Sequence, residues 1–326
     1  MKRIFLYGDV FLNSGPSNVN KSLIANSEGT LLSFKHENRL LKSLELLWNL
    51  QRADLIIMSG GCSLSRLHQI KKLSKHTPIV YLMHGNLEYE NRINRLDLSE
   101  DALQAEIELM ETASRIVCVS ERYAHWVSDK YPQYRRKICF VNNGLELKLR
   151  PPKKKIPFSI ALSGGNRMIK NNRAVCEAVE KLIAEDFPCN ISLFGRLYPN
   201  NDDLLKYPFV SYKGQLGKEE YYQNLDQCSL FILNSTLESF GIAVGDALNC
   251  RCSILLSDSV GAGSILTLNE TDRIRNPDDL DTLAEKIKFT LLHSNAERLW
   301  NSLDIQACSG KQAFLNLKKI CDEILA

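Results

Sequence analysis

Short apolar runs alternate with longer amphipathic stretches along almost the whole chain. In the first half, apolar runs with the length of buried strands lie at residues 2–8, 30–34, 54–59, 78–83, 115–119 and 137–141. Stretches with apolar positions at helical spacing separate most of them, at residues 37–51, 64–75, 100–114 and 121–131. A strand followed by a helix, repeated in this way, predicts βαβ units around a parallel sheet and an α/β fold.

The alternation breaks once, near residue 150, and then resumes. The segment 147–155 holds two prolines and five basic residues, which cannot join a core, and it therefore predicts an interdomain linker. Beyond it, strands are expected near residues 158–163, 190–195, 209–213, 229–234 and 252–257, and helices near 170–186, 218–226, 239–249, 278–292 and 310–325. We predict doubly wound domains over residues 1–147 and 156–305, followed by a C-terminal helical segment over 306–326.

Length and composition fit this two-domain organisation. A chain of 326 residues is too long for one ordinary core, and 44% hydrophobic with 24% charged residues is typical of a soluble globular protein. No apolar run approaches the ~20 residues needed to cross a bilayer. The apolar start of the chain stops at Gly8-Asp9 without a small-residue cleavage site, so we interpret it as a buried strand and expect a cytoplasmic protein.

The ten cysteines are scattered through the sequence. They form no CxxC pair and no His/Cys cluster with metal-ligand spacing, so the sequence predicts no metal site. Most of them, such as Cys118, Cys139 and Cys228, sit inside apolar runs. We expect reduced thiols in the cores of a cytosolic protein.

The two halves of the chain differ in charge. Residues 1–150 hold 21 Lys and Arg against 16 Asp and Glu, a net charge of +5, whereas residues 151–326 hold 20 against 22, a net charge of −2. The basic excess leaves open a peripheral contact with the cytoplasmic face of the inner membrane, and ordinary charge scatter is the alternative. No basic patch is interleaved with aromatic residues, so we expect no nucleic-acid partner.

Two carboxylates follow the apolar run at 230–233. We expect a helix that opens at Ser239, with Glu238 at its start and Asp246 two turns later. The free N–H groups and the positive end of the helix dipole would suit a phosphate. At ~1.5 Å per residue the two acids would lie roughly 12 Å apart, comparable to the distance from the sugar to the ribose of a nucleotide-sugar. The alternative is a surface helix with an unrelated, solvated Asp246.

Two cations follow the first strand of the second half. The run 158–163 ends in Gly164-Gly165, and Arg167 and Lys170 come next, before a helix. Glycines let the backbone approach a ligand closely, and two cations can neutralise a diphosphate leaving group. The alternative is a basic first turn on a solvated helix.

These motifs resemble retaining glycosyltransferases with the GT-B fold, specifically glycosyltransferase family 4 (glycosyl transferases group 1). The resemblance covers nearly the whole chain and is most specific over residues 158–263. The chain departs from the family pattern in having Asp246 as its second acid and a short interval between Arg167 and Lys170. The resemblance implies two Rossmann-like domains that face each other across a cleft, with segment 306–326 packing back on the first domain.

The resemblance also implies roles for individual residues. His84, at a strand end, matches the histidine that the family places against the donor sugar; a structural core histidine is the alternative. Gly15 lies in a loop where family members often have two adjacent glycines, and a plain loop into a helix is the alternative. The implied catalytic residues are His84, Glu238, Arg167 and Lys170. The implied donor-binding residues are Gly15, Gly164, Gly165, Arg167, Lys170, Tyr212, Ser239, Phe240, Gly241 and Asp246.

The implied activity is a metal-independent, retaining glycosyl transfer without a cofactor. The second domain would bind a nucleotide-diphosphate sugar, with UDP favoured, and the first a glycan or lipid-linked acceptor of cell-surface polysaccharide synthesis. Asp202-Asp203 are adjacent in a polar loop and are not an Asp-x-Asp motif. A nucleotide-sugar epimerase or hydrolase and a catalytically silent paralogue remain as alternatives. An NAD enzyme is disfavoured because no G-x-G-x-x-G follows the first strand.

Overall fold

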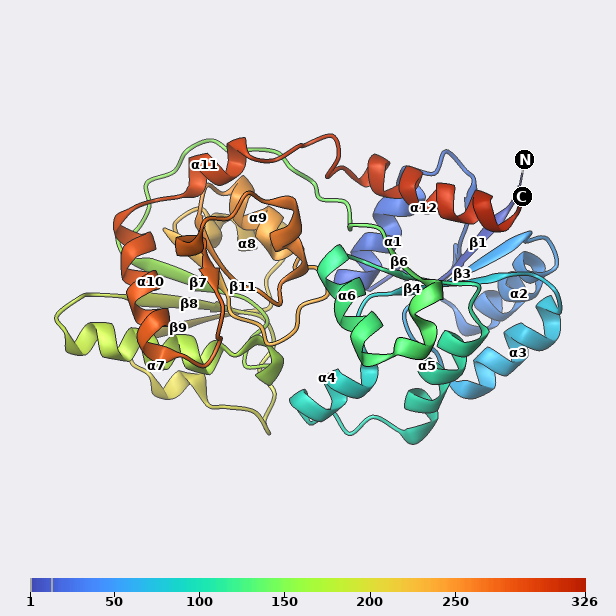
Figure 1. The fold of residues 1–326 in the computed structure, drawn as a ribbon, viewed down its shortest axis with the longest axis horizontal. Coiled ribbons are helices and arrows are strands. Elements are labelled where there is room, and N and C mark those ends of the chain that lie inside the picture. Colours follow the sequence, from blue (N-terminus) through green and yellow to red (C-terminus); the bar gives the residue numbers. More distant parts are fainter. Residues whose placement is uncertain (1, 13) are drawn as a thin grey trace. The chain divides into compact units, whose positions relative to one another are not determined.

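The computed structural model describes residues 2–12 and 14–326, so Asn13, which begins the expected loop after the first strand, lies outside the described residues. The chain divides into two compact units (Figure 1). Unit 1 comprises Met1–Arg92, Leu96–Leu145 and Gln306–Ala326, and unit 2 comprises Ile93–Arg95 and Glu146–Ile305. None of the helices in the described residues is both long and apolar enough to span a bilayer.

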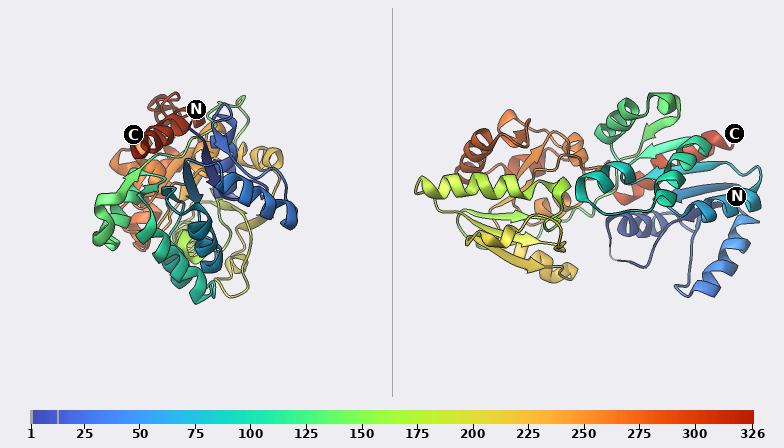
Figure 2. Two further views of the ribbon diagram at one scale, coloured as in Figure 1. Left: turned by 90° about the vertical axis from the view of Figure 1, so that its right-hand side faces the viewer. Right: turned by 90° about the horizontal axis from the view of Figure 1, so that it is seen from below.

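Unit 1 is built on a six-stranded parallel sheet with strand order β2-β1-β3-β4-β5-β6. Its strands are β1 (Ile4–Tyr7), β2 (Leu31–Leu32), β3 (Leu55–Ser59), β4 (Ile79–Met83), β5 (Arg115–Cys118) and β6 (Ile138–Phe140). Helices cover both faces of the sheet (Figure 2). Burial on both faces explains why the central strands are continuous apolar runs and do not alternate.

Serine side chains cap the N-termini of most helices in unit 1. The helices are α1 (Gly15–Ala25), α2 (Arg39–Leu50), α3 (Leu64–Ser74), α4 (Leu87–Asn94), α5 (Glu100–Thr112), α6 (Glu121–Lys130) and α12 (Gly310–Ile324), with a 3-10 turn η1 (Pro132–Lys137). Each cap accepts a hydrogen bond from a backbone N–H in the first helical turn, which stabilises the helix start. The capping serines are Ser14, Ser63, Ser99, Ser120 and Ser309.

Unit 2 repeats the architecture with strand order β12-β11-β10-β7-β8-β9, all parallel. The strands are β7 (Ser159–Leu162), β8 (Asn190–Phe194), β9 (Val210–Gly214), β10 (Leu230–Leu233), β11 (Ser253–Ser257) and β12 (Arg273–Ile274). The helices are α7 (Asn172–Ala184), α8 (Lys218–Leu225), α9 (Ala243–Asn249), α10 (Leu280–Leu292) and α11 (Ala296–Asn301). Short 3-10 turns are η2 (Met168–Lys170), η3 (Leu204–Lys206), η4 (Gly261–Ile265) and η5 (Glu270–Asp272). The two parallel sheets confirm the predicted α/β class.

One predicted helix is shorter than expected. The helix expected over 239–249 begins at Ala243, because the backbone before it is paired elsewhere. The Glu238 N–H donates to Ser259 O at 3.1 Å, and the Ala262 N–H donates to Phe240 O at 2.6 Å. This loop therefore pairs with the connection after β11, and the predicted spacing of two acids along one helix is wrong.

The basic segment after residue 146 has no regular secondary structure and is bound to unit 2. The Arg150 guanidinium lies 3.1 Å from the Asp226 carboxylate, and Lys155 Nζ donates to Cys250 O at 2.6 Å. The Lys148 N–H donates to Asn249 Oδ1 at 2.7 Å. The side chains of Arg150 and Lys155 are therefore fixed to the surface of unit 2 by specific hydrogen bonds and an ion pair.

Candidate active site

The connection between β7 and α7 is shaped by two glycines. Gly164 and Gly165 have φ values of +88° and +62°, a conformation that residues with a Cβ rarely adopt. A Cβ on Gly165 would lie 1.9 Å from Arg196 O, so a side chain has no room there. The Gly165 N–H donates to Phe194 O at 2.8 Å. This turn packs directly on the end of β8 and then positions the two predicted cations.

The predicted cation and the predicted carboxylate form an ion pair. Lys170 Nζ contacts Glu238 Oε2, although the two residues lie 68 positions apart in sequence. Their side chains are only 11% and 15% exposed. Lys170 follows β7 and Glu238 follows β10, and these strands are neighbours in the sheet, so both residues lie at its carboxyl edge. The Thr236 N–H donates to Ile169 O at 2.9 Å and ties the two loops together.

Arg167 lies on the same connection, three residues before Lys170 and just before η2. Its side chain is half-buried, and the Lys170 N–H donates to Arg167 O at 3.0 Å. The connection between β7 and α7 therefore carries both cations that the sequence predicts for a diphosphate.

Ser239, Phe240 and Gly241 lie in the loop before α9, not in a helix as predicted. The Phe240 ring is 1% exposed, so its side chain belongs to the core and only its backbone can meet a ligand. Because α9 begins at Ala243 and has seven residues, the predicted helix N-terminus at residue 239 does not exist. The argument that a helix dipole holds phosphate beside Glu238 is therefore wrong.

Asp246 lies in α9 and is held by a tyrosine that the sequence analysis missed. The Tyr222 hydroxyl donates to Asp246 Oδ1 at 2.6 Å. Burial raises the pKa of the Asp246 carboxyl above its ordinary value, against the lowering effect of the Tyr222 hydrogen bond. The alternative of a solvated helix residue is thus wrong. Tyr222 could have been recognised as the apolar-facing position of α8, but no sequence signal pairs it with Asp246.

Tyr212 lies on β9, at the edge of the unit 2 sheet. Its hydroxyl donates to Gly195 O at 2.9 Å, and the Gly195 N–H donates to Gly214 O at 2.8 Å. Tyr212 is therefore fixed close to the glycine turn at residue 165, on which Gly195 packs.

Unit 1 has a candidate site of its own, around His84. His84 follows β4, and its Nε2 lies 2.8 Å from the Ser59 hydroxyl at the end of β3. The Ser59 hydroxyl donates its proton to Asn20 Oδ1 at 2.6 Å, and Asn20 Nδ2 in turn donates to Asp9 O at 2.9 Å. If the Asn20 amide were flipped, its Oδ1 would face the carbonyl oxygen of Asp9, and neither atom could donate a hydrogen bond. The contacts therefore fix Nδ2 as the atom that faces Asp9 O and Oδ1 as the acceptor from Ser59.

This chain of hydrogen bonds sets the protonation of His84. Because the single proton of Ser59 goes to Asn20, Ser59 must accept from the His84 Nε2–H. Burial lowers the pKa of His84 to about 4, so the ring is neutral near pH 7. The other ring nitrogen, Nδ1, therefore carries a lone pair and can accept a hydrogen bond from a ligand hydroxyl.

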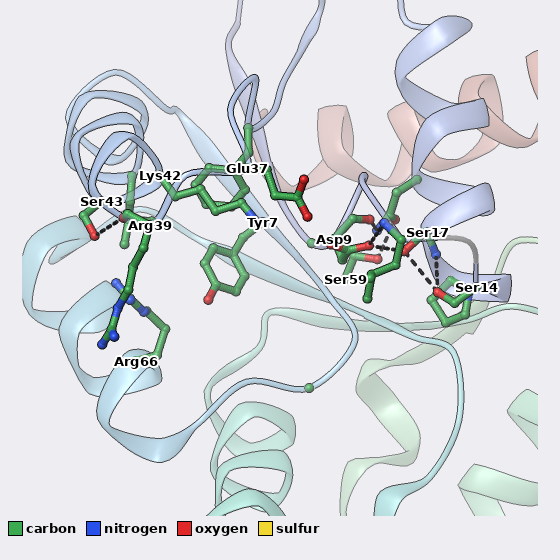
Figure 3. Close-up of a pocket in the computed structure, with 17 residues that line it drawn as sticks. Tyr7, Asp9, Ser14, Ser17, Glu37, Arg39, Lys42, Ser43, Ser59 and Arg66 are labelled. Atoms are coloured by element: carbon green, nitrogen blue, oxygen red, sulfur yellow. Dashed lines mark hydrogen bonds between the residues drawn. The ribbon is translucent and has the colours of Figure 1, made fainter.

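A cavity of about 500 Å³ opens at the carboxyl ends of β1 and β3 (Figure 3). Asp9 lies on one side of it, and its carboxylate accepts from the Leu12 N–H at 2.9 Å and from the Ser17 hydroxyl. Burial opposes ionisation of Asp9, but these hydrogen bonds prevail and lower its pKa. Arg39, Lys42 and Arg66 also line the cavity.

The sequence analysis missed this cavity because β1, β3, α2 and α3 contribute to it from distant parts of the chain. Gly15 is not among the described residues that line it, although Ser14, Pro16 and Ser17 are. The only available sequence signal was Gly8-Asp9 at the end of the first strand.

A buried carboxyl supports the segment after His84. Glu106 accepts from the Tyr81 hydroxyl at 2.9 Å, from Asn86 Nδ2 at 3.0 Å and from the Leu87 N–H at 3.0 Å. Burial raises the pKa of Glu106 to about 7. Asn86 is fully buried, and its hydrogen bond to Glu106 anchors the loop that begins at His84.

Comparison with known proteins gives the family. The model described as Glycosyltransferase Family 4 matches residues 16–149, and the model described as Glycosyl transferases group 1 matches residues 204–302. No protein of curated function matches the sequence.

Solved structures share the fold. Anabaena HepE in complex with UDP and glucose has a TM-score of 0.72 at 15% identity, over 99% of this chain and 100% of that one. The lipopolysaccharide outer core galactosyltransferase WaaB has a TM-score of 0.66 at 13% identity, over 99% of both chains. The pneumococcal O-GlcNAc transferase GtfA, in complex with UDP and GlcNAc, has a TM-score of 0.63 at 15% identity, over 87% of this chain and 60% of that one. Because one family model matches most of unit 1, the other matches within unit 2, and solved glycosyltransferase structures share the fold over the whole chain, the protein belongs to the family 4 glycosyltransferases.

Proposed function

We propose that the protein is a retaining glycosyltransferase that moves a sugar from a UDP-sugar to a glycan or lipid-linked oligosaccharide acceptor. The acceptor would belong to the synthesis of a cell-surface polysaccharide such as capsule, O-antigen or exopolysaccharide. The observation that carries the proposal is the ion pair of Lys170 and Glu238, which sets a phosphate-binding cation beside a carboxylate that can hold sugar hydroxyls. The UDP complexes of HepE and GtfA support UDP as the nucleotide.

In this proposal unit 2 binds the donor. Arg167 and Lys170 meet the charge of the diphosphate, and Glu238 accepts hydrogen bonds from the sugar hydroxyls. Asp246, oriented by Tyr222, accepts from the ribose hydroxyls. Tyr212 and the glycine turn at 164–165 lie at the same edge of the sheet and bound the nucleotide site.

Unit 1 binds the acceptor in its polar cavity and supplies His84. The unprotonated Nδ1 of His84 accepts a hydrogen bond from a sugar hydroxyl. The acceptor oxygen forms its bond to the anomeric carbon on the face from which the diphosphate departs, so the configuration is retained. A leaving diphosphate oxygen takes the acceptor proton, and no enzyme carboxylate has to act as a covalent nucleophile.

We also propose that the transfer needs no divalent metal. Two cations on one connection supply positive charge where the diphosphate develops negative charge, which is the task that a metal ion performs in other enzymes. Donor turnover should therefore persist in excess EDTA. Activity that EDTA abolishes and magnesium or manganese restores would refute this part of the proposal.

Calorimetric titration with UDP, GDP and dTDP, followed by assay of UDP release from a panel of UDP-sugars, tests the donor assignment. We expect UDP to bind and to raise the melting temperature, because a ligand that binds only the folded state stabilises it. Arg167→Ala and Lys170→Ala should each lower turnover by ~10²–10³-fold. The matched control is Arg173→Ala, because Arg173 is an exposed cation on α7 that pairs with Glu177. This substitution should leave turnover unchanged.

Product analysis separates the proposal from its alternatives. A retaining transferase gives an acceptor glycoside with the anomeric configuration of the donor, as read by NMR. A hydrolase releases free sugar without any acceptor. An epimerase inverts one ring carbon of the sugar, also without any acceptor. A silent paralogue binds UDP and releases nothing from any UDP-sugar.

A further inference from the structure

Helix α2 exposes an apolar face that no described segment of unit 1 covers. Leu40, Leu44 and Trp48 are 77%, 63% and 56% exposed, and Leu41 and Leu47 are exposed beside them. At 100° per residue these five side chains fall within an arc of roughly 120° that contains no charged residue. The opposite face packs on the unit through Leu46, Asn49 and Leu50. An ordinary surface helix carries polar residues at such positions, so this face fits an apolar partner.

The part of the chain that carries the apolar face has an excess of cations. Residues 35–75 hold eight Lys and Arg against three Asp and Glu, and this net charge of +5 equals the whole excess of residues 1–150. The Arg52 guanidinium lies over the Trp48 ring, 3.5 Å from its centroid. Lys72 and Lys75 are exposed at the end of α3, which packs on α2. The partner should therefore be apolar inside and negatively charged at its surface.

We propose that the apolar face of α2 and the cations around it bind the surface of an anionic lipid bilayer. A helix with Leu and Trp on one face and flanking Lys and Arg lies in the plane of such an interface, with its apolar side chains below the headgroups. A second copy of the chain fits less well, because two surfaces that both have an excess of cations would repel each other.

The same helix reaches the unit 1 cavity. Arg39, Lys42 and Ser43 of α2 line the cavity, and Arg66 of α3 extends on the same side (Figure 3). The exposed Leu12 lines the cavity as well, and Lys42 lies over the Phe11 ring, 4.5 Å from its centroid. If the proposed glycosyl transfer holds, on which this step rests, an acceptor carried on a lipid can leave its chain in the bilayer while its polar head enters the cavity.

Vesicle flotation of the full-length protein tests the proposal. We expect the parent to float with vesicles of phosphatidylcholine and phosphatidylglycerol, and not with phosphatidylcholine alone. Leu44→Gln combined with Trp48→Gln should lower the partition coefficient at least about tenfold, since it removes two apolar side chains that the bilayer would bury. Lys72→Gln and Lys75→Gln should each lower it about fivefold, and high salt should do the same.

Ile107→Gln combined with Leu315→Gln is the matched control, because both side chains are exposed and apolar but lie on α5 and α12. It should float as the parent does. Equal flotation of the α2 variant and the parent would overturn the proposal. So would a parent that sediments as a dimer, is made monomeric by the α2 variant and never floats, because the face would then be a self-interface.

The outcome is separable from that of the proposed function. UDP titration of the α2 variant should match the parent, since neither Leu44 nor Trp48 lies in unit 2. Failure to float with normal UDP binding rejects the membrane surface alone. Normal flotation without binding of any nucleotide rejects the donor assignment alone.

Discussion

The hydroxyl of Ser59 lies 2.8 Å from His84 Nε2 and gives its proton to Asn20, so it can only accept from the histidine. This contact selects one tautomer of a neutral ring. We predict that Ser59→Ala mixes the two tautomers and lowers donor turnover while UDP affinity stays unchanged. Nitrogen NMR of the labelled imidazole should show Nε2–H in the parent and averaged shifts in the variant. Ser65→Ala on α3 is the control, and a parent protonated at Nδ1 would contradict the assignment.

Lys170 and Glu238 should not respond alike to substitution. Glu238→Gln frees the Lys170 ammonium for phosphate, so UDP affinity should be kept or raised while turnover falls steeply. Lys170→Ala should weaken UDP binding and leave the half-buried Glu238 carboxylate unpaired, at a cost to stability of a few kcal/mol. Calorimetry and thermal melting of both variants and of the double variant provide the measurement. Equal losses of UDP affinity in the two single variants would contradict these roles.

Asp246 should govern nucleotide binding. Asp246→Asn should weaken UDP binding by roughly 1.5–3 kcal/mol, because one charged hydrogen-bond partner is lost. Tyr222→Phe should have a smaller effect in the same direction, since it leaves the carboxylate in place but no longer orients it. Asp246→Glu keeps the charge and should be tolerated better than Asn. Unchanged UDP affinity in Asp246→Asn would limit Asp246 to a structural role.

Glu106 should make the stability of unit 1 fall as pH rises. The pKa of Glu106 in the folded protein is about 7, above the ordinary 4.5. Between pH 4.5 and pH 7 the carboxyl is therefore protonated in the folded state and ionised in the unfolded chain. The stability contribution is complete below pH 4.5 and is lost by pH 7, on the order of 3 kcal/mol. Glu106→Gln should therefore gain melting temperature relative to the parent as pH rises from 5 to 8. Parallel melting curves for the two proteins would exclude a buried, protonated Glu106.

Two glycines that the sequence analysis assigned to one site should behave differently. Gly165→Ala should destabilise unit 2 severely, because the new Cβ meets Arg196 O and φ is positive. A Cβ on Gly15 meets no atom within 4 Å, so Gly15→Ala should leave the melting temperature unchanged. A loss of turnover in Gly15→Ala would then report contact with a ligand. A large fall in its melting temperature would show that the helix start needs glycine.

The strands could be predicted because burial on both faces makes them continuous apolar runs, and β3 and β4 match within one residue at each end. Helix α4, helix α11 and strand β12 were not predicted, because they are short or polar and depend on their neighbours. The start of α9 was misplaced for a related reason. Residues 238–240 pair with residues 259–262, and no local pattern in either segment announces this pairing.

Some residues of the candidate site could likewise be predicted from the sequence, and others could not. Lys170 and Glu238 each follow an apolar strand, and strands that end at one sheet edge bring their next residues together, so both could be identified from sequence. Tyr222, Ser59, Asn20 and Glu106 act through one hydrogen bond or a few, made across the fold. Their residue types are common and they belong to no motif of fixed spacing, so only the structure identifies them.

The low pKa of His84 has a consequence for the pH–rate profile of the enzyme. With a pKa of about 4, the imidazole keeps one charge state from mildly acidic to alkaline buffer. A rise or fall in rate near neutrality therefore cannot be ascribed to His84, although it is the histidine assigned to the site. An inflection near pH 7 would instead point to Glu106, which supports the His84 loop without lining the cavity, and Glu106→Gln should abolish that inflection.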